Sequence, residues 1–371
     1  MCFVAHRKRL VGGCGLSGSE GVRVHLHDSG KFSCEVTGFH GYEQEILRLR
    51  NANRDEPETL EYLHWRYQRS PDSPEPQVFW LMTPDRQRIG MASVIFRPYW
   101  SNNTRVQTAV VGDISLDTRW RGRGLGQVLL RFMTEYLDEH FPQQPAFVIP
   151  TEAARRALTN VGWVTSGALV PHVYVLDATR YARAVVRSEW LATRIARLMR
   201  TLARIVTRLH AARDSSLHLT GTLDESLLEF ARRLPPPGNA VHDLGPESLN
   251  WRYAQHPHTR FSFARFARSD ETRGLLVFED STLEHTWSIY DLAAQTPADL
   301  RAMLTLFVQH ALSEPDLVAL RVTLDERHPC RTHLRRLGFI ARRPDAVFQV
   351  HSRGGMAERL VWCVTQGDKD T

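Results

Sequence analysis

The 371-residue chain is long enough for two domains with separate cores, and its 42% hydrophobic and 24% charged residues are ordinary for a soluble globular protein. Its five scattered cysteines contain no Cys-x-x-Cys pair, which argues against a disulfide framework and favours a reducing cytoplasm. The net charge of +6 suits a polyanionic ligand or an anionic surface, and the sequence has neither a signal-peptide core nor an apolar run long enough to span a membrane.

The first domain is predicted to cover residues 21–177, after an N-terminal extension of residues 1–20. It contains a segment that recurs later in the chain, Leu63-His-Trp-Arg-Tyr-Gln-Arg-Ser-Pro71, and the apolar stretches that follow it are typical of strands. Arg66 in this segment is a candidate for binding an acceptor substrate in a groove. It could equally be a cation that covers core aromatic side chains.

A glycine-rich turn at 121–127 is the most informative feature of the sequence. A strand-like run leads into Arg121-Gly-Arg-Gly-Leu-Gly-Gln127, and apolar residues then recur at helical spacing. Glycines let backbone N–H groups approach a ligand, and a helix start adds unpaired N–H groups with a partial positive charge. Together with Arg121 and Arg123, the turn suits a phosphate or pyrophosphate, although an ordinary tight turn with solvated arginines would contain the same residues.

The spacing [QR]-x-x-G-x-[GA], from Arg121 through Gly124 to Gly126, resembles the acyl-CoA pyrophosphate loop of the GNAT superfamily of N-acyltransferases. A buried-strand pattern at 146–150, a helix pattern and a Gly-Trp stop at 162–163 then follow in the order typical of that family. The resemblance implies a domain that binds acetyl-CoA. The residues it assigns to the cofactor are Leu116, Asp117, Thr118, Arg121, Gly122, Arg123, Gly124, Leu125, Gly126 and Gln127.

No motif fixes the residues that would move protons. The resemblance implies a tyrosine acid on the last helix in many relatives, but Leu158 occupies the matching position here. Asp113, on the strand before the glycine turn, is therefore the predicted general base, with Glu152, His172 and Tyr174 as weaker candidates. Tyr174 is also a predicted acceptor-binding residue.

Residues 178–238 are predicted to join the two domains through a long amphipathic helix and a proline-rich turn. Between 178 and 213 the chain has nine arginines and one acidic residue. The helix could lie on a membrane surface through 187–209, contact nucleic acid, or pack between the domains. Since packing is the usual fate of an apolar stripe, Leu198 and Leu202 are expected in an interdomain contact, and no nucleic-acid partner is expected. The stripe consists of Leu191, Ile195, Leu198, Leu202, Ile205 and Leu209.

Residues 239–371 are predicted to be a degenerate second copy of the first domain. Leu249-Asn-Trp-Arg-Tyr-Ala-Gln-His-Pro257 repeats the earlier segment, and a Gly-Phe stop follows at 338–339. Where the glycine turn should fall, at 287–300, there is neither a glycine nor a basic residue, and Thr296-Pro297 is typical of an ordinary helix start. The second copy is therefore expected to keep the fold without binding CoA.

The chain ends in Gly-Asp-Lys-Asp-Thr, which resembles the ending of some bacterial GNAT-like proteins from polysaccharide clusters. This resemblance makes Asp368 and Asp370 candidates for acceptor-binding carboxylates, and solvated terminal acids are the alternative. The two His-x-His pairs, which begin at His25 and His256, lack a third ligand at a fitting distance, so no metal is expected.

Together these patterns predict an α/β protein of tandem GNAT-like domains, each with a mixed, mostly antiparallel sheet flanked by helices. The expected activity is the transfer of an acyl group, with acetyl as the first choice, from CoA to a primary amine such as an amino sugar of a bacterial polysaccharide. The alternatives are a Fem-type aminoacyl-tRNA-dependent transferase and a non-catalytic CoA-binding scaffold. A cytoplasmic location is expected, with contact at the inner membrane face if the helix lies on lipid.

Overall fold

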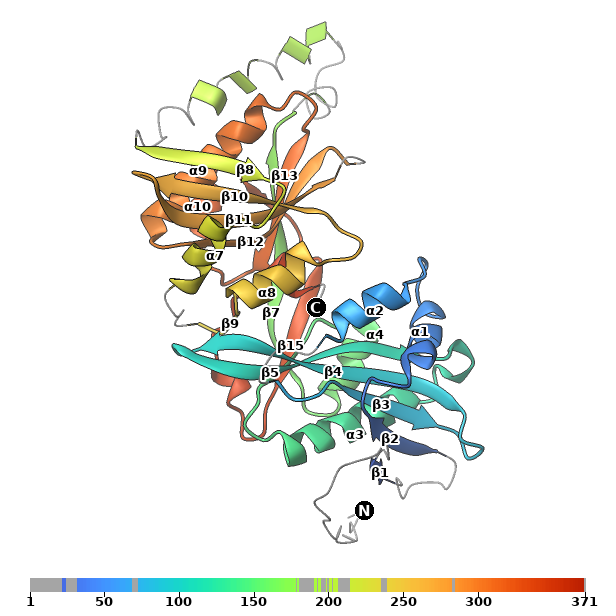
Figure 1. Ribbon diagram of the computed structural model, residues 1–371. Coiled ribbons are helices and arrows are strands. Elements are labelled where there is room, and N and C mark those ends of the chain that lie inside the picture. Colours follow the sequence, from blue (N-terminus) through green and yellow to red (C-terminus); the bar gives the residue numbers. More distant parts are fainter. Residues whose placement is uncertain are drawn as a thin grey trace.

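The computed structural model describes residues 22–24, 32–68, 73–177, 214–234, 239–281 and 284–369, with scattered positions between 179 and 205. Within these residues, two sets of elements in the same order lie end to end (Figure 1).

The first copy has the order of elements expected from the sequence, with the glycine turn between its longest strand pair and its longest helix. Thr59 and Thr151 begin the second and fourth helices, because each side-chain oxygen accepts a backbone N–H of the first turn. The elements are β1 (Val22–Val24), β2 (Ser33–Thr37), α1 (Glu43–Asn51), α2 (Leu60–Arg66), β3 (Gln77–Met82), β4 (Arg88–Ser101), β5 (Thr104–Leu116), η1 (Thr118–Trp120), α3 (Leu125–His140), β6 (Ala146–Val148), α4 (Glu152–Thr159) and β7 (Val164–Val175).

The second copy repeats this order from residue 215 onward. Thr296 caps its longest helix and Pro297 lies in the first turn, which confirms the helix start predicted there. The elements are β8 (Ser215–Thr220), α7 (Glu225–Arg232), β9 (Val241–His242), α8 (Pro246–Leu249), η2 (Asn250–Ala254), β10 (Phe261–Arg268), β11 (Glu271–Ser281), β12 (Thr286–Ala294), α9 (Pro297–Ser313), β13 (Ala319–Asp325), α10 (Arg331–Leu337), β14 (Ile340–Ala341), β15 (Ala346–His351), η3 (Ala357–Arg359) and η4 (Gln366–Asp368).

The first elements of the second copy lie within the predicted linker, residues 178–238. β8 pairs with β10, and α7 packs Leu227 and Phe230 against Phe261 of the same strand. We therefore propose that the second copy begins near residue 214 and that the linker is correspondingly shorter.

One sheet runs through both copies in the order β1-β2-β3-β4-β5-β6-β15-β7-β13-β12-β11-β10-β8. β5 with β6 and β12 with β13 are parallel, and the other neighbours along this path are antiparallel. The predicted mixed, mostly antiparallel sheet flanked by helices is confirmed.

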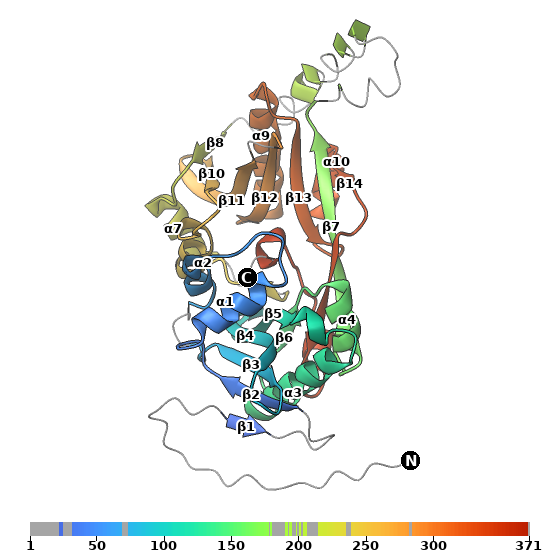
Figure 2. The ribbon, with the colours of Figure 1, turned by 90° about the vertical axis from the view of Figure 1, so that its right-hand side faces the viewer.

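The two copies exchange strands where they meet. Residues 164–169 of β7 pair with β15 in the first copy, and residues 169–175 pair with β13 in the second. Figure 2 shows β7 extending from the first copy alongside β13. In return, β15 comes from the end of the chain and lies between β6 and β7. Each copy therefore completes its sheet with a strand whose sequence lies in the other half of the chain.

Helices cover both faces of the first copy's sheet. α3 packs Leu129 and Met133 against Phe79 on one face, while α2 packs Leu63 against Trp80 on the other. Figure 1 shows α1 and α2 on one side of β3 and β4, and α3 on the opposite side. The end of β5 therefore lies between the start of α3 and the helix pair α1–α2.

The structure contradicts the prediction that Leu198 lies in an interdomain contact. Leu198 is 59% exposed, and Leu191 and Ile205 of the same stripe are also exposed. The reason is that arginines of this segment, rather than its leucines, contact the second copy. Leu202 lies outside the described residues. None of the helices in the described part of the chain is both long enough and apolar enough to cross a membrane.

Candidate active site

The start of α3 is an open backbone cradle. Gly122 and Gly124 have φ values of 74° and 76°, a conformation that favours glycine. Gly124 is the N-cap of α3 and supplies no side-chain cap. An added Cβ at Gly122, Gly124 or Gly126 would meet no atom within 4 Å, so a ligand can approach this backbone closely. The turn thus fits the anionic group that the sequence predicts there.

Three arginines surround this cradle and differ in their contacts. Arg121 donates from Nε to the carbonyl oxygen of Leu116 at 3.2 Å and also contacts Asn53, which follows α1. The guanidinium of Arg123 lies 5.0 Å from the ring centre of Trp120. Arg121 and Arg123 are exposed and can face a phosphate.

Arg119 pairs with Asp117 at 2.8 Å. Hydrogen bonds from Arg119 lower the pKa of Asp117 to about 2. Asp117 thereby caps η1, which carries Thr118, at the edge of the predicted cofactor site.

A cleft opens between β5 and β6 beside this cradle. The two strands pair only at Ala109 with Ala146 and at Val110 with Phe147, after which β5 continues and β6 ends. The space between them is about 430 Å³. Its lining includes residues 110–115 of β5, residues 147–151, Ala154, Arg50, Asn53 and Arg54 of α1 and the residues after it, Tyr62 and Arg66 of α2, and Asp368 with Lys369.

A β-bulge in β5 forms one wall of the cleft. Ser93 of β4 pairs with Gly112 and Met91 pairs with Ser115, so Asp113 and Ile114 of β5 oppose one residue of β4. Asp113 has a φ of 52°, which is unusual for a residue with a side chain. The bulge therefore needs contacts that hold it in place.

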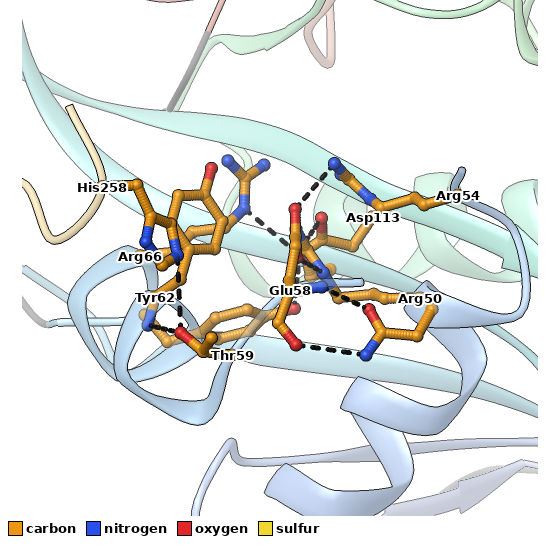
Figure 3. Close-up of polar contacts among 11 residues, drawn as sticks. Arg50, Arg54, Glu58, Thr59, Tyr62, Arg66, Asp113 and His258 are labelled. Carbon is orange, nitrogen blue, oxygen red and sulfur yellow. Dashed lines mark hydrogen bonds and ion pairs between the residues drawn. The ribbon is translucent and has the colours of Figure 1, made fainter. Parts of the chain in front are cut away.

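Those contacts converge on the Asp113 carboxylate (Figure 3). Its Oδ2 accepts from Tyr67 Oη at 2.8 Å, Ser93 Oγ at 3.2 Å and Arg66 Nε at 3.3 Å. Its Oδ1 is ion-paired with Arg50, which also donates to Glu58 at 2.6 Å. The side chain of Asp113 is 1% exposed. Because both oxygens are occupied, the geometry does not favour the predicted role as a general base.

The same tyrosine–aspartate contact recurs in the second copy. Tyr253 donates from Oη to Asp291, which lies beside a register shift in β12. Each Trp-Arg-Tyr triplet therefore holds an aspartate at a bulge through its tyrosine. This is a structural role that the sequence could not separate from acceptor binding.

The tryptophans of the two triplets join the copies to each other. Trp65 and Trp251 stack with their ring centres 5.2 Å apart. Each indole N–H donates to the other's backbone oxygen, at 2.7 and 2.8 Å. Arg66 lines the cleft as predicted, but its Nη2 lies so close to Gly112 that a Cβ there would be 2.6 Å away.

In the second copy, the chain's own C-terminal segment occupies the corresponding space between β12 and β13. Thr365 bridges to Leu324 and donates to Asp291 at 2.6 Å. At Gly367 an added Cβ would lie 2.3 Å from Tyr253 Oη. Among the described residues, the second copy thus has no glycine cradle at the start of α9, and beside the C-terminal segment its cleft is reduced to a space of about 230 Å³ lined by β12, β13 and Gln366.

Asp368 lines the cleft but is buried, which excludes a solvated terminal acid, while acceptor binding by Asp368 stays a prediction. Its Oδ1 accepts from Tyr99 Oη at 2.6 Å and is paired with His242 Nδ1 at 3.0 Å. His242 also faces Asp291 at 2.9 Å. Burial would lower the pKa of His242, but these two carboxylates raise it to about 9. Asp370 lies outside the described residues.

Tyr174 does not line the cleft, and its role in acceptor binding stays a prediction. It lies on the part of β7 that enters the second copy, where it pairs with Leu320 and its ring packs 5.3 Å from that of Phe339. His172 lies on the same part and is fully buried. Neither side chain reaches the cleft, because the strand crosses out of the first copy before these positions.

The sequence analysis missed residues from α1 and α2 at the cleft. Arg50, Asn53, Arg54 and Tyr62 line it, and none belongs to a recognisable motif. Tyr62 stacks on His258 of the second copy, with ring centres 5.3 Å apart, and Thr59 Oγ1 lies 3.4 Å from His258 Nε2 (Figure 3). The second copy therefore supports the acceptor side of the first.

Comparison with known proteins agrees with this geometry. Residues 43–159, which include the cradle and the bulge, match the model of the acetyltransferase (GNAT) family. No curated protein matches the sequence significantly.

Solved structures share the fold of most of the chain at low sequence identity. A probable N-acyltransferase from Enterococcus faecalis aligns with a TM-score of 0.60 and 10% identity over 86% of this chain and 72% of that one. A GCN5-related N-acetyltransferase from Anabaena variabilis aligns with a TM-score of 0.59 and 10% identity, over 86% of this chain and 73% of that one. A GCN5-related N-acetyltransferase from Kribbella flavida aligns with a TM-score of 0.51 and 14% identity, over 87% of this chain and 73% of that one.

Proposed function

We propose that this chain, whose residues 43–159 match the model of the acetyltransferase (GNAT) family, is an acyltransferase that moves an acetyl group from acetyl-CoA to a primary amine. The observation that supports this most directly is the open cleft of about 430 Å³ where β5 and β6 separate, next to the glycine-capped start of α3. We place the CoA pyrophosphate at residues 121–127, and the pantetheine arm beside Leu116 in the cleft.

Acetyl-CoA supplies an activated thioester, and the chain positions it. At the bulge, the strand register leaves Ile114 without a partner residue in β4. The backbone near the bulge can therefore polarise the thioester carbonyl. The amine nitrogen attacks that carbonyl carbon, the carbon–sulfur bond breaks, and the CoA thiolate leaves. Catalysis then rests mainly on positioning, with the amine proton released to water.

In this proposal Asp113 is a positioning residue rather than the base. Its contacts with Arg66, Tyr67 and Ser93 tie α2 and β4 to the bulge. The carboxylate thus fixes the backbone that faces the thioester, which supports catalysis without proton transfer.

The acceptor is proposed to enter from the side of α1 and α2. Asn53, Arg54 and Tyr62 give this mouth hydrogen-bonding groups and one aromatic ring. Such a lining suits a hydroxylated amine, so an amino sugar of a bacterial polysaccharide is the acceptor class that we propose to test first. A cytoplasmic location would give the cleft access to acetyl-CoA.

The test is mass spectrometry of amine acceptors incubated with the full chain and acetyl-CoA. We expect a gain of one acetyl group on an amino sugar, and loss of that product in Gly124→Glu, which blocks the cradle and adds a negative charge. Tight acetyl-CoA binding without acetylation of any amine in a broad panel would instead identify a CoA-binding scaffold.

A further inference from the structure

Described residues of the arginine-rich segment form a helical face that points away from the protein. Trp190, Leu191, Leu198 and Ile205 are 61%, 42%, 59% and 50% exposed. All four residues are helical, and in a regular helix with 100° per residue their positions would fall within about 100° of one another. Arg194 lies on the same face, with its guanidinium 4.0 Å from the ring centre of Trp190. We call these five residues the outer face.

Other residues of the segment hold it to the second copy. Arg200 and Arg204 donate from Nε to the carbonyl oxygen of Leu312, at 3.1 and 3.0 Å, and Ala203 packs against the second copy's core. Leu312 lies in the last turn of α9, where carbonyl groups lack helical partners and carry a partial negative charge. Two arginines therefore hold the segment with its apolar residues outward.

This orientation is the reverse of the usual one, in which the apolar stripe faces the protein. Four large apolar side chains are exposed, and the helical pieces between β7 and β8 lie at the end of the second copy remote from the first copy in both views (Figures 1 and 2). Since exposed apolar clusters of this kind mark interaction sites, we expect the outer face to bind a partner.

We propose that the outer face binds an anionic membrane surface. The stretch 178–213 carries one acidic residue and nine arginines, of which Arg200 and Arg204 bond to α9, and the whole chain has a net charge of +6. Anionic lipid headgroups attract such a segment, while leucine, isoleucine and tryptophan side chains enter the interface. This is the arrangement of a helix that lies along a membrane rather than across it.

A second copy of the chain is a poorer fit for the outer face. A two-fold dimer would place the face against itself and bring Arg194 of one copy toward Arg194 of the other, a like charge. Specific interfaces also bury about 20 to 30 residues on each side, far more than the five residues of the outer face. An anionic membrane surface can pair with Arg194 through its headgroups and take up the four apolar side chains at its interface.

The experiment is flotation of the full-length protein with phosphatidylcholine vesicles, with and without phosphatidylglycerol. We expect binding only to the phosphatidylglycerol vesicles, weakened by added salt. Leu198→Asp and Ile205→Asp should each reduce binding at least about tenfold, because a charge replaces an inserted apolar side chain. Met356→Asp is the matched control, since Met356 is 42% exposed and lies away from the outer face.

Thermal melting separates this outcome from misfolding. Because Leu198 and Ile205 are exposed, both variants should melt as the wild type does. Equal vesicle binding by the wild type and both variants, or no binding by the wild type, would overturn the proposal. So would concentration-dependent dimerisation that Leu198→Asp abolishes in the absence of vesicles, because the partner would then be a second copy.

Discussion

Replacing Asp113 by asparagine separates a positioning role from a basic one. The substitution keeps the shape of the side chain but removes the charge that faces Arg50 and Arg66, whose side chains are 1% and 8% exposed. Removing one partner of a buried pair costs about 3–5 kcal/mol of unfolding free energy. Arg50 still pairs with Glu58 in this variant, so we expect a loss of unfolding free energy at the lower end of that range, about 3 kcal/mol. Burial lowers the pKa of Arg50 only to about 10, so it cannot shed its proton at neutral pH.

The assay is urea unfolding of the wild type, Asp113→Asn and Ser93→Ala, together with the pH dependence of turnover. Ser93→Ala removes one hydrogen bond to the same carboxylate and should cost only about 1 kcal/mol. In Asp113→Asn at temperatures where it is folded, turnover should fall without a change in the shape of the pH profile. Wild-type stability combined with loss of the acidic (low-pH) limb of that profile would refute the positioning role and restore Asp113 as the base.

Two further predictions concern the joint between the copies. The pKa of His242 is raised from 6.5 to about 9, so its contribution is fully present below pH 6.5 and is lost as the pH rises through 9. Stability should fall by about 3 kcal/mol over that range, and a slope unchanged in His242→Gln would contradict this assignment. A fragment of residues 239–371 lacks β7, β8 and α7, so it should be unfolded by circular dichroism, and a cooperatively melting fragment would show that the strand exchange is dispensable.

Local patterns in the sequence predict the cradle and the element order. Arg121 to Gln127 combine glycine spacing with a helix start, and both are properties of adjacent residues. The repeated Trp-Arg-Tyr triplets likewise indicate two copies of one fold. These features depend on short stretches of chain, which is why the pattern alone predicts them.

The rest depends on partners far away in the sequence. No sequence pattern around Asp113 indicates that Arg50 and Tyr67 will contact its carboxylate. Likewise, no pattern around Asp368 indicates that it will pair with His242. Strand periodicity tells which face of β7 is apolar, but it does not tell which strand lies beside it. For the same reason the leucine stripe around Leu198 predicts an amphipathic helix without saying whether protein or lipid covers it.

Calorimetric titration of the full chain with acetyl-CoA tests the central claim most directly. We predict one molecule bound per chain, because the second copy's cleft holds residues of the C-terminal segment. Gly124→Glu should weaken binding at least about tenfold. Gly354→Glu, at a glycine that also has a positive φ and open surroundings, should leave it unchanged. Two molecules per chain, or equal affinity in the wild type and Gly124→Glu, would contradict the assignment of the acyl-CoA site to the first copy.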